Sequence, residues 1–176
     1  MRRIAAVLIF IIVPLWANQA SDKVTLIDAY SFKFGIVIPE NWKGVQQKIK
    51  DDYLLYMLYN KKSTPLKPGP VITIQTFPKI AGDMQDYLMG KIHDMQQKKQ
   101  DTIVEEFDFF HPEYDSFSAV FYKEKQSYIY MTAIDPGASY RKGLLFYMSL
   151  PGREATQEEM GVFMNMVESL SLIEMK

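Results

Sequence analysis

The sequence predicts one α+β domain, in which two main helices pack on a mostly antiparallel sheet of about six to eight strands. Two patterns support this prediction. Many short segments alternate apolar and polar residues, which is typical of strands with one face on a core, and two longer stretches space their apolar residues near 3.6, as amphipathic helices do. Because helical stretches are few, most strands must be joined directly, and this favours antiparallel pairing.

The first seventeen residues have the composition of an export signal. Arg2 and Arg3 form a basic start, an apolar run follows at residues 4–13, and Ala17 offers a small residue for cleavage. The run is shorter than the roughly 20 residues that a membrane-spanning helix needs. We therefore assign residues 1–17 to a signal peptide and residues 18–176 to a single domain, which is exported to the periplasm or the medium. An uncleaved anchor or a buried core helix is the alternative.

Composition limits the partners that the exported chain can have. Removing residues 1–17 from the 176-residue chain leaves 176 − 17 = 159 residues. The removed segment contains two arginines, so 18 Lys and Arg remain against 21 Asp and Glu, and the net charge is 18 − 21 = −3. Such a chain lacks the basic field that nucleic acids attract. The chain has no Cys, which excludes disulfides and thiol chemistry. We expect a monomer that binds neither nucleic acid nor, after cleavage, a membrane.

Strands are expected wherever the alternation is clear, at residues 24–27, 32–38, 45–49, 53–59, 71–77, 103–110, 117–123, 127–134 and 144–150. Pro39 cannot donate to a sheet ladder, so it ends the second of these strands, and the turn that follows directs Trp42 back onto the sheet. Residues 53–59 are apolar on both faces, which indicates a central strand covered on both sides.

Two helices are expected, and each has its own start signal. Asp83 is the predicted N-cap of the first helix. Thr156 and Glu159 have the spacing of a capping box, so the second helix should begin at Gln157. The residues that we expect to form the two apolar stripes are Met84, Tyr87, Leu88, Ile92 and Met95 in the first helix, and Met160, Phe163, Met164, Val167 and Leu170 in the second.

The order of these elements resembles that of the PsbP superfamily, named after an extrinsic photosystem protein. The same superfamily contains the Mog-type nucleotide-release factors that bind the Ran GTPase. The resemblance rests on Phe32-Lys33-Phe34 leading to Ile38-Pro39-Glu40-Asn41-Trp42, then on the helix at residues 83–99, and on residues 116–150 with the closing helix. It implies an αβα sandwich and a binding or assembly role. By fold analogy alone it also implies a GTPase-type partner and a secreted effector.

Residues of the types used in catalysis do not gather into a motif in this sequence. His93 and His111 have carboxylates near them, but no second His or Cys stands at a metal-ligand spacing. We therefore interpret His93 as part of a solvated helix face and His111 as a turn histidine with solvent-facing carboxylates. Glu105, Glu106 and Asp108 are explained by the charge that protects an edge strand. We therefore predict no catalytic residue, no metal and no cofactor, and hence no enzyme.

The aromatic residues give the remaining candidates for function. The predicted partner surface consists of aromatic and basic residues, namely Tyr122, Tyr128, Tyr130, Tyr140, Arg141, Lys142, Lys61, Lys62 and Lys67. Tyrosine and arginine are enriched at interfaces, although cross-strand packing under a helix would explain the tyrosines and a solvated loop the lysines. We predict an exported, non-catalytic protein-binding or accessory module. The alternative is a small-ligand carrier with a pocket between sheet and helix.

Overall fold

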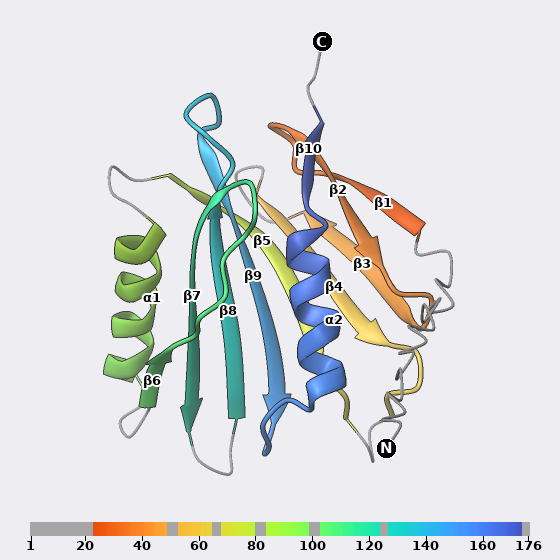
Figure 1. Ribbon diagram of the computed structural model, residues 1–176, viewed down its shortest axis with the longest axis vertical. Helices are drawn as coiled ribbons and strands as arrows, with labels where there is room; N and C mark the ends of the chain where they lie inside the picture. The colour runs from red at the N-terminus through yellow and green to blue at the C-terminus, as the bar shows by residue number, and fades with distance from the viewer. Residues whose placement is uncertain are drawn as a thin grey trace, which may run out of the picture.

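The computed structural model describes residues 23–48, 53–64, 68–79, 84–98, 103–123 and 127–173. It has two antiparallel sheets and two helices, as Figure 1 shows, and it confirms the predicted α+β class. The predicted signal peptide and the predicted N-cap Asp83 lie outside the described residues.

The larger sheet has seven strands in the order β3-β4-β5-β9-β8-β7-β6, and each neighbouring pair is antiparallel. Its strands are β3 (Trp42–Lys48), β4 (Leu54–Asn60), β5 (Val71–Pro78), β6 (Ile103–Glu106), β7 (Asp115–Lys123), β8 (Ser127–Asp135) and β9 (Lys142–Pro151). The predicted antiparallel pairing is thus confirmed for this sheet. The acidic strand β6 forms one edge, where charge opposes pairing with another chain.

The smaller sheet has three strands in the order β1-β2-β10, with β1 (Lys23–Asp28), β2 (Lys33–Ile38) and β10 (Ser171–Ile173). The first two predicted strands therefore leave the main sheet. The chain turns after β2, where the Trp42 amide donates to the Pro39 carbonyl at 2.9 Å, and Trp42 is buried as predicted. Strand β10 was not predicted, because a three-residue strand is too short to show alternation.

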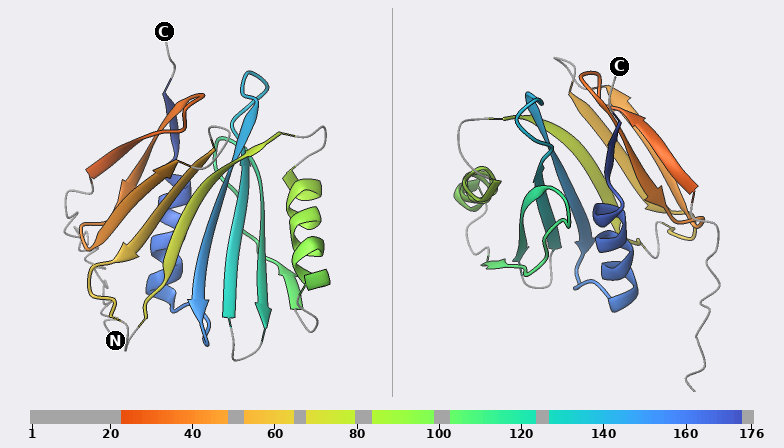
Figure 2. Two further views of the ribbon diagram at one scale, coloured as in Figure 1. Left: turned by 180° about the vertical axis from the view of Figure 1, so that it is seen from behind. Right: turned by 45° about the horizontal axis from the view of Figure 1, so that its top comes forward.

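The helices α1 (Met84–Lys98) and α2 (Gln157–Glu168) cover opposite faces of the seven-stranded sheet. Helix α2 and the three-stranded sheet share one face, and α1 lies on the other, which both views of Figure 2 show. The core on the α2 side is filled by fully buried side chains from both sheets and the helix, among them Phe34, Phe146 and Phe163. This arrangement follows from the two-residue period of a strand, which gives each strand two faces to cover.

The buried stripe of α2 differs from the prediction in part. Phe163 and Val167 are buried as expected, but Met166 is also buried, while Met160 and Met164 are only half-buried. The i, i+3, i+4 spacing from Phe163 selects Met166 and Val167 as its neighbours on one face. Met160 and Met164 therefore lie at the margin of that face.

Strand β4 is less deeply placed than the sequence indicated. It lies second from the β3 edge, and α1 packs on β7 and β8 rather than over it. Leu54, Tyr56 and Leu58 are consequently buried on the α2 side, whereas Leu55 and Met57 on the other face are half-buried. The prediction that this strand is covered on both sides was wrong, because apolar composition does not reveal how far one helix extends across a sheet.

A glycine in β9 allows an aromatic side chain to join α1 to the sheet. A Cβ atom added at Gly143 would overlap ring carbons of Phe77, whose ring stacks on Tyr87 of α1 at 3.6 Å and 10°. We expect Gly143→Ala to lower the free energy of unfolding by about 1–3 kcal/mol, since the ring cannot shift without losing this stack. Urea unfolding followed by circular dichroism measures the change.

Gly90 of α1 gives the matched control, because a Cβ added there meets no atom within 4 Å. Gly90→Ala should leave the stability unchanged or raise it by up to about 1 kcal/mol, as expected for Ala in place of Gly in an exposed helix. Equal effects of the two substitutions would show that the Phe77 contact is unimportant.

Candidate functional site

A surface hollow of about 390 Å³ lies between the β4–β5 loop and the β9–α2 loop. It is lined by Asn60, Lys62, Ser63, residues 68–70, Arg153 and Glu159. The sheet register explains why these loops meet, because Tyr59 at the end of β4 pairs with Val71, and Val71 pairs with Ser149 near the end of β9. We call this feature the Arg153 hollow.

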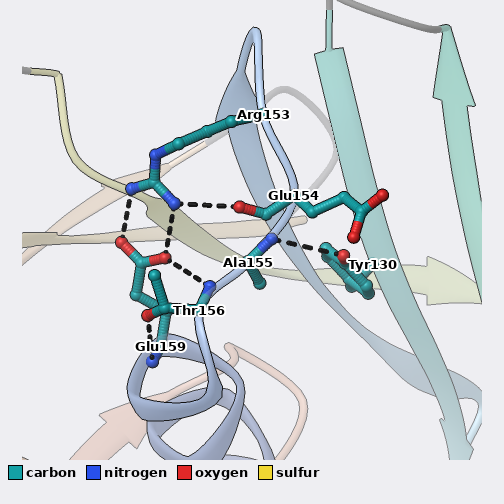
Figure 3. A network of polar contacts seen from close by, with 6 residues as sticks. All are labelled: Tyr130, Arg153, Glu154, Ala155, Thr156 and Glu159. Atoms are coloured by element: carbon teal, nitrogen blue, oxygen red, sulfur yellow. Dashed lines mark hydrogen bonds and ion pairs between the residues drawn. The ribbon is translucent and has the colours of Figure 1, made fainter.

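Arg153 is held in place by a bidentate ion pair with Glu159, which Figure 3 shows. Arg153 Nη1 donates to Glu159 Oε2 at 2.7 Å and Nη2 donates to Oε1 at 2.6 Å, while Nη1 also donates to the Glu154 carbonyl at 2.9 Å. A paired geometry of this kind is strong and restricts the guanidinium to one orientation. The guanidinium is therefore already ordered in the wall of the hollow.

The same carboxylate caps helix α2. Glu159 Oε2 accepts the Thr156 amide at 2.9 Å, and the Glu159 amide donates to Thr156 Oγ1 at 3.2 Å, so the predicted capping box is confirmed. The hydrogen bond from Arg153 lowers the pKa of Glu159 against the opposing effect of partial burial. The Glu159 hydrogen bond in turn raises the pKa of Arg153. Both groups are consequently charged at neutral pH.

The three tyrosines predicted on β7 and β8 lie on the sheet face that α2 covers, and all three are half-buried. Tyr130 accepts the Ala155 amide at 3.3 Å, which ties β8 to the loop that carries Arg153, as Figure 3 shows. Tyr122 and Tyr128 stack at 5.0 Å and 6°, and Tyr122 donates to Glu105 at 2.9 Å. These rings both pack across strands and keep part of their surface exposed.

The predicted lysines of the β4–β5 loop have different surroundings. Lys62 is exposed and lines the Arg153 hollow. Lys61 instead directs its Nζ to the Glu40 carbonyl, at 2.7 Å, and so is committed to the β2–β3 turn. Lys67 lies outside the described residues.

The predicted segment Tyr140, Arg141 and Lys142 lies beyond the opposite end of β8 and does not join the other tyrosines. Tyr140 packs edge-on against Phe32 at 5.2 Å, and Lys142 Nζ lies 4.5 Å from the centre of the Tyr53 ring. Arg141 is exposed. The predicted partner surface is therefore divided between two ends of the sheet, because Tyr128 lies near the start of β8 and Tyr140 lies in the loop that follows the end of β8.

His111 lies in a turn as predicted, and the carboxylates of Glu113 and Asp115 are exposed as expected, but the histidine itself is buried. The turn connects β6 and β7, and only 6% of the His111 surface is exposed. The residues that follow it, Pro112 and Glu113, are of types common in exposed turns and are exposed here, so the local sequence gave no sign that His111 is buried. His93, by contrast, is exposed on α1 as predicted.

The described residues contain neither a cluster of metal-ligating side chains nor a membrane-spanning helix. No three His, Cys, Asp or Glu side chains in the described ranges gather as a metal site would require. In the same part of the chain, no helix has the length and apolar character to cross a membrane.

Comparisons with known proteins identify the fold. No protein family model matches the sequence, and no curated protein matches it. Among solved structures, the solution structure of cyanobacterial PsbP (CyanoP) from Synechocystis sp. PCC 6803 is similar, with a TM-score of 0.52 and 11% identity over 92% of this chain and 100% of that chain. This likeness confirms the predicted PsbP-like fold. At such low identity it shows the fold alone, so the relation to Ran-binding factors stays a prediction.

The shared role of Glu159 as cap and ion-pair partner predicts the effect of its removal. We expect Glu159→Ala to lower the free energy of unfolding by about 1 kcal/mol at neutral pH. The substitution removes a helix cap and an ion pair with Arg153, and the ion pair adds little because it is partly exposed. Because the pKa of Glu159 is lowered in the folded state, its contribution is present above the ordinary value of 4.5 and is lost as the pH falls through the lowered value. The difference from wild type should therefore shrink in acid.

Denaturant midpoints measured at neutral pH and at about pH 3 check this prediction. Glu158→Ala is the matched control, because Glu158 stands in the same first turn and is exposed. A stability loss from Glu158→Ala as large as that from Glu159→Ala would mean that general helix-end charge, rather than the specific network, accounts for the effect.

Proposed function

We propose that this chain is exported and acts as a non-catalytic binding module, which holds an acidic segment of a partner protein in the Arg153 hollow. The observation that supports the proposal most is the fixed guanidinium of Arg153 beside the exposed Lys62 in a hollow of about 390 Å³. Ligand sites in proteins typically have volumes of roughly 300–1,000 Å³, so one or two side chains of a partner would fill it.

The lining of the hollow carries two positive charges, on Lys62 and Arg153, and one negative charge, on Glu159, so its net charge of +1 favours an anion such as a carboxylate. Arg153 uses three of its five N–H donors for Glu154 and Glu159, which leaves two for a partner. Lys62 has no ion pair among the described residues. Because Arg153 is already ordered by Glu159, little side-chain entropy would be lost when a second carboxylate binds.

The tyrosines of β7 and β8 extend the contact surface near the hollow. Tyr128 pairs with Leu150, three residues before Arg153, and its ring stacks on that of Tyr122. Half-exposed tyrosines beside an arginine match the composition of protein interfaces. The partner would thus place an acidic group in the hollow and apolar surface against the rings.

Two narrower hypotheses have less support. A GTPase-type partner and a role as a secreted effector rest on fold analogy alone, and a GTPase is one partner class to test. A small-ligand carrier would need space between α2 and the sheet, but fully buried Phe146 and Phe163 occupy that region. We therefore favour protein binding at the surface.

Export is tested by the mass of the mature protein. Expression of the full-length chain with a C-terminal tag in a Gram-negative host should give a product that begins at or near Asn18, in the periplasm or in the medium. Intact-mass spectrometry of the fractions measures this directly. A product that keeps Met1 and stays with the membrane would contradict export.

Binding is tested with an acetylated hexaglutamate peptide added to the exported, isotope-labelled protein. We expect amide shifts at the loops of the Arg153 hollow, weakened by added salt, and no such shifts with hexaglutamine. Lys62→Gln should weaken binding about fivefold, as expected for loss of one partly exposed charge contact of about 1 kcal/mol.

Lys61→Gln is the matched control for this experiment, because it removes the adjacent positive charge while the Lys61 ammonium is bound to the Glu40 carbonyl. It should leave the affinity for hexaglutamate nearly unchanged. Equal losses from the two substitutions would show only a general attraction to the basic loop, and an absence of shifts at the hollow would reject the site.

A further inference from the structure

His111 holds its turn together through a ring nitrogen that must be free of a proton. Its Nδ1 accepts the Glu113 amide at 3.0 Å and the Tyr114 amide at 3.1 Å, and its own amide donates to Ser116 Oγ at 2.7 Å. A nitrogen that accepts two hydrogen bonds carries no hydrogen, so the ring is neutral and its proton lies on Nε2. The turn is therefore built around neutral histidine.

The other ring nitrogen lies at the C-terminal end of α2. Nε2 is buried and has no hydrogen-bond partner of good geometry among the described residues, although the carbonyls of Val167 and Leu170 lie near it. The carboxylates of Glu113, on the same turn, and Glu168, on α2, are also close enough to favour a positive charge on the ring. Burial opposes them and is the larger effect.

The same turn is connected to the C-terminal strand. The Tyr114 ring lies 4.7 Å from the His111 ring, and the Tyr114 hydroxyl accepts the Leu172 amide at 3.2 Å. Strand β10, which contains Leu172, has only three residues, and its single strand partner in the sheet is β2. So short a strand depends on contacts such as this one, because few hydrogen bonds hold it to the sheet.

We propose that His111 is an acid-sensitive latch: a proton added to Nδ1 opens the turn at residues 111–114 and releases the Leu172 amide of β10 from Tyr114. An imidazolium ion has two donors and no acceptor, so the amides of Glu113 and Tyr114 would face a hydrogen instead of a lone pair. The turn must then open to relieve this contact. Tyr114 moves with it, and the Leu172 amide loses its acceptor.

The direction of the pH response follows from the burial of the ring. Burial lowers the pKa of His111 below its ordinary value of 6.5, so the neutral ring is favoured in the folded protein. Its contribution to stability is complete above 6.5 and is lost as the pH falls through the lowered value. The chain has two histidines, so His93 provides the histidine control for this response.

Hydrogen exchange measured by NMR on the exported product of the full-length chain tests the latch. The Leu172 amide should lose protection as the pH is lowered from about 7 to about 5, after correction for intrinsic exchange rates. The loss should reach up to tenfold for each pH unit between the ordinary His111 pKa of 6.5, which applies when the turn is open, and the lowered pKa of the closed turn. The Phe146 amide in the central strand β9 should lose less. An equal loss at both amides would indicate global unfolding and overturn the proposal.

Two substitutions separate His111 from other titrating groups. In His111→Asn, the Asn Oδ1 can accept the same two amides but does not titrate, so the acid response of Leu172 should disappear. His93→Gln removes the exposed histidine of α1 and should keep the response. A response that persists in His111→Asn, or that disappears in His93→Gln, would reject the latch.

Tyr114→Phe provides a test that does not alter His111. It removes the acceptor of the Leu172 amide and keeps the ring and both bonds to Nδ1. Leu172 should then exchange rapidly at both pH values, without a further acid effect. If Leu172 in this variant still loses protection only in acid, the connection through Tyr114 is wrong.

Discussion

The core between the two sheets is built on one apolar contact, the buried face of helix α2. Phe163, Met166 and Val167 are fully buried in a single core cluster that also contains side chains from both sheets. Each such side chain contributes roughly 1.5–3 kcal/mol when it is buried. The contact joins the three-stranded sheet to the seven-stranded sheet, and it fixes the positions of both ends of the helix.

The two ends of α2 have different chemistry. Its N-terminal end is a rigid polar network, in which Thr156, Glu159 and Arg153 satisfy one another. Its C-terminal end lies against the neutral ring of His111 and continues into a strand of three residues. The C-terminal end is also bonded, since Ser169 Oγ donates to the Met166 carbonyl and accepts the Val37 amide. What distinguishes it is the His111 ring, which must stay neutral to accept the amides of its turn. Binding and response to acid would then be properties of opposite ends of one helix.

Among the described residues, the seven-stranded sheet is only partly covered by helices, and this shapes the surface available to partners. Helix α1 packs on β7 and β8, so Leu55 and Met57 of β4 keep part of their surface exposed on the same face. One helix is about 10 Å wide, whereas seven strands at about 4.8 Å spacing extend over nearly three times that width. The fold therefore offers open sheet surface, and this distinguishes it from a closed barrel with an internal site.

The sequence by itself determined the fold class, most strand positions and the start of α2, since these follow from local periodicity and from the capping pair Thr156 and Glu159. It also indicated Lys62 and Tyr130 as residues of interest. Only the tertiary structure decided that the first two strands form a separate sheet with β10, that Arg153 and Lys62 line one hollow and that His111 is buried. These features depend on strand order and register, which join residues distant in sequence and which local alternation does not specify.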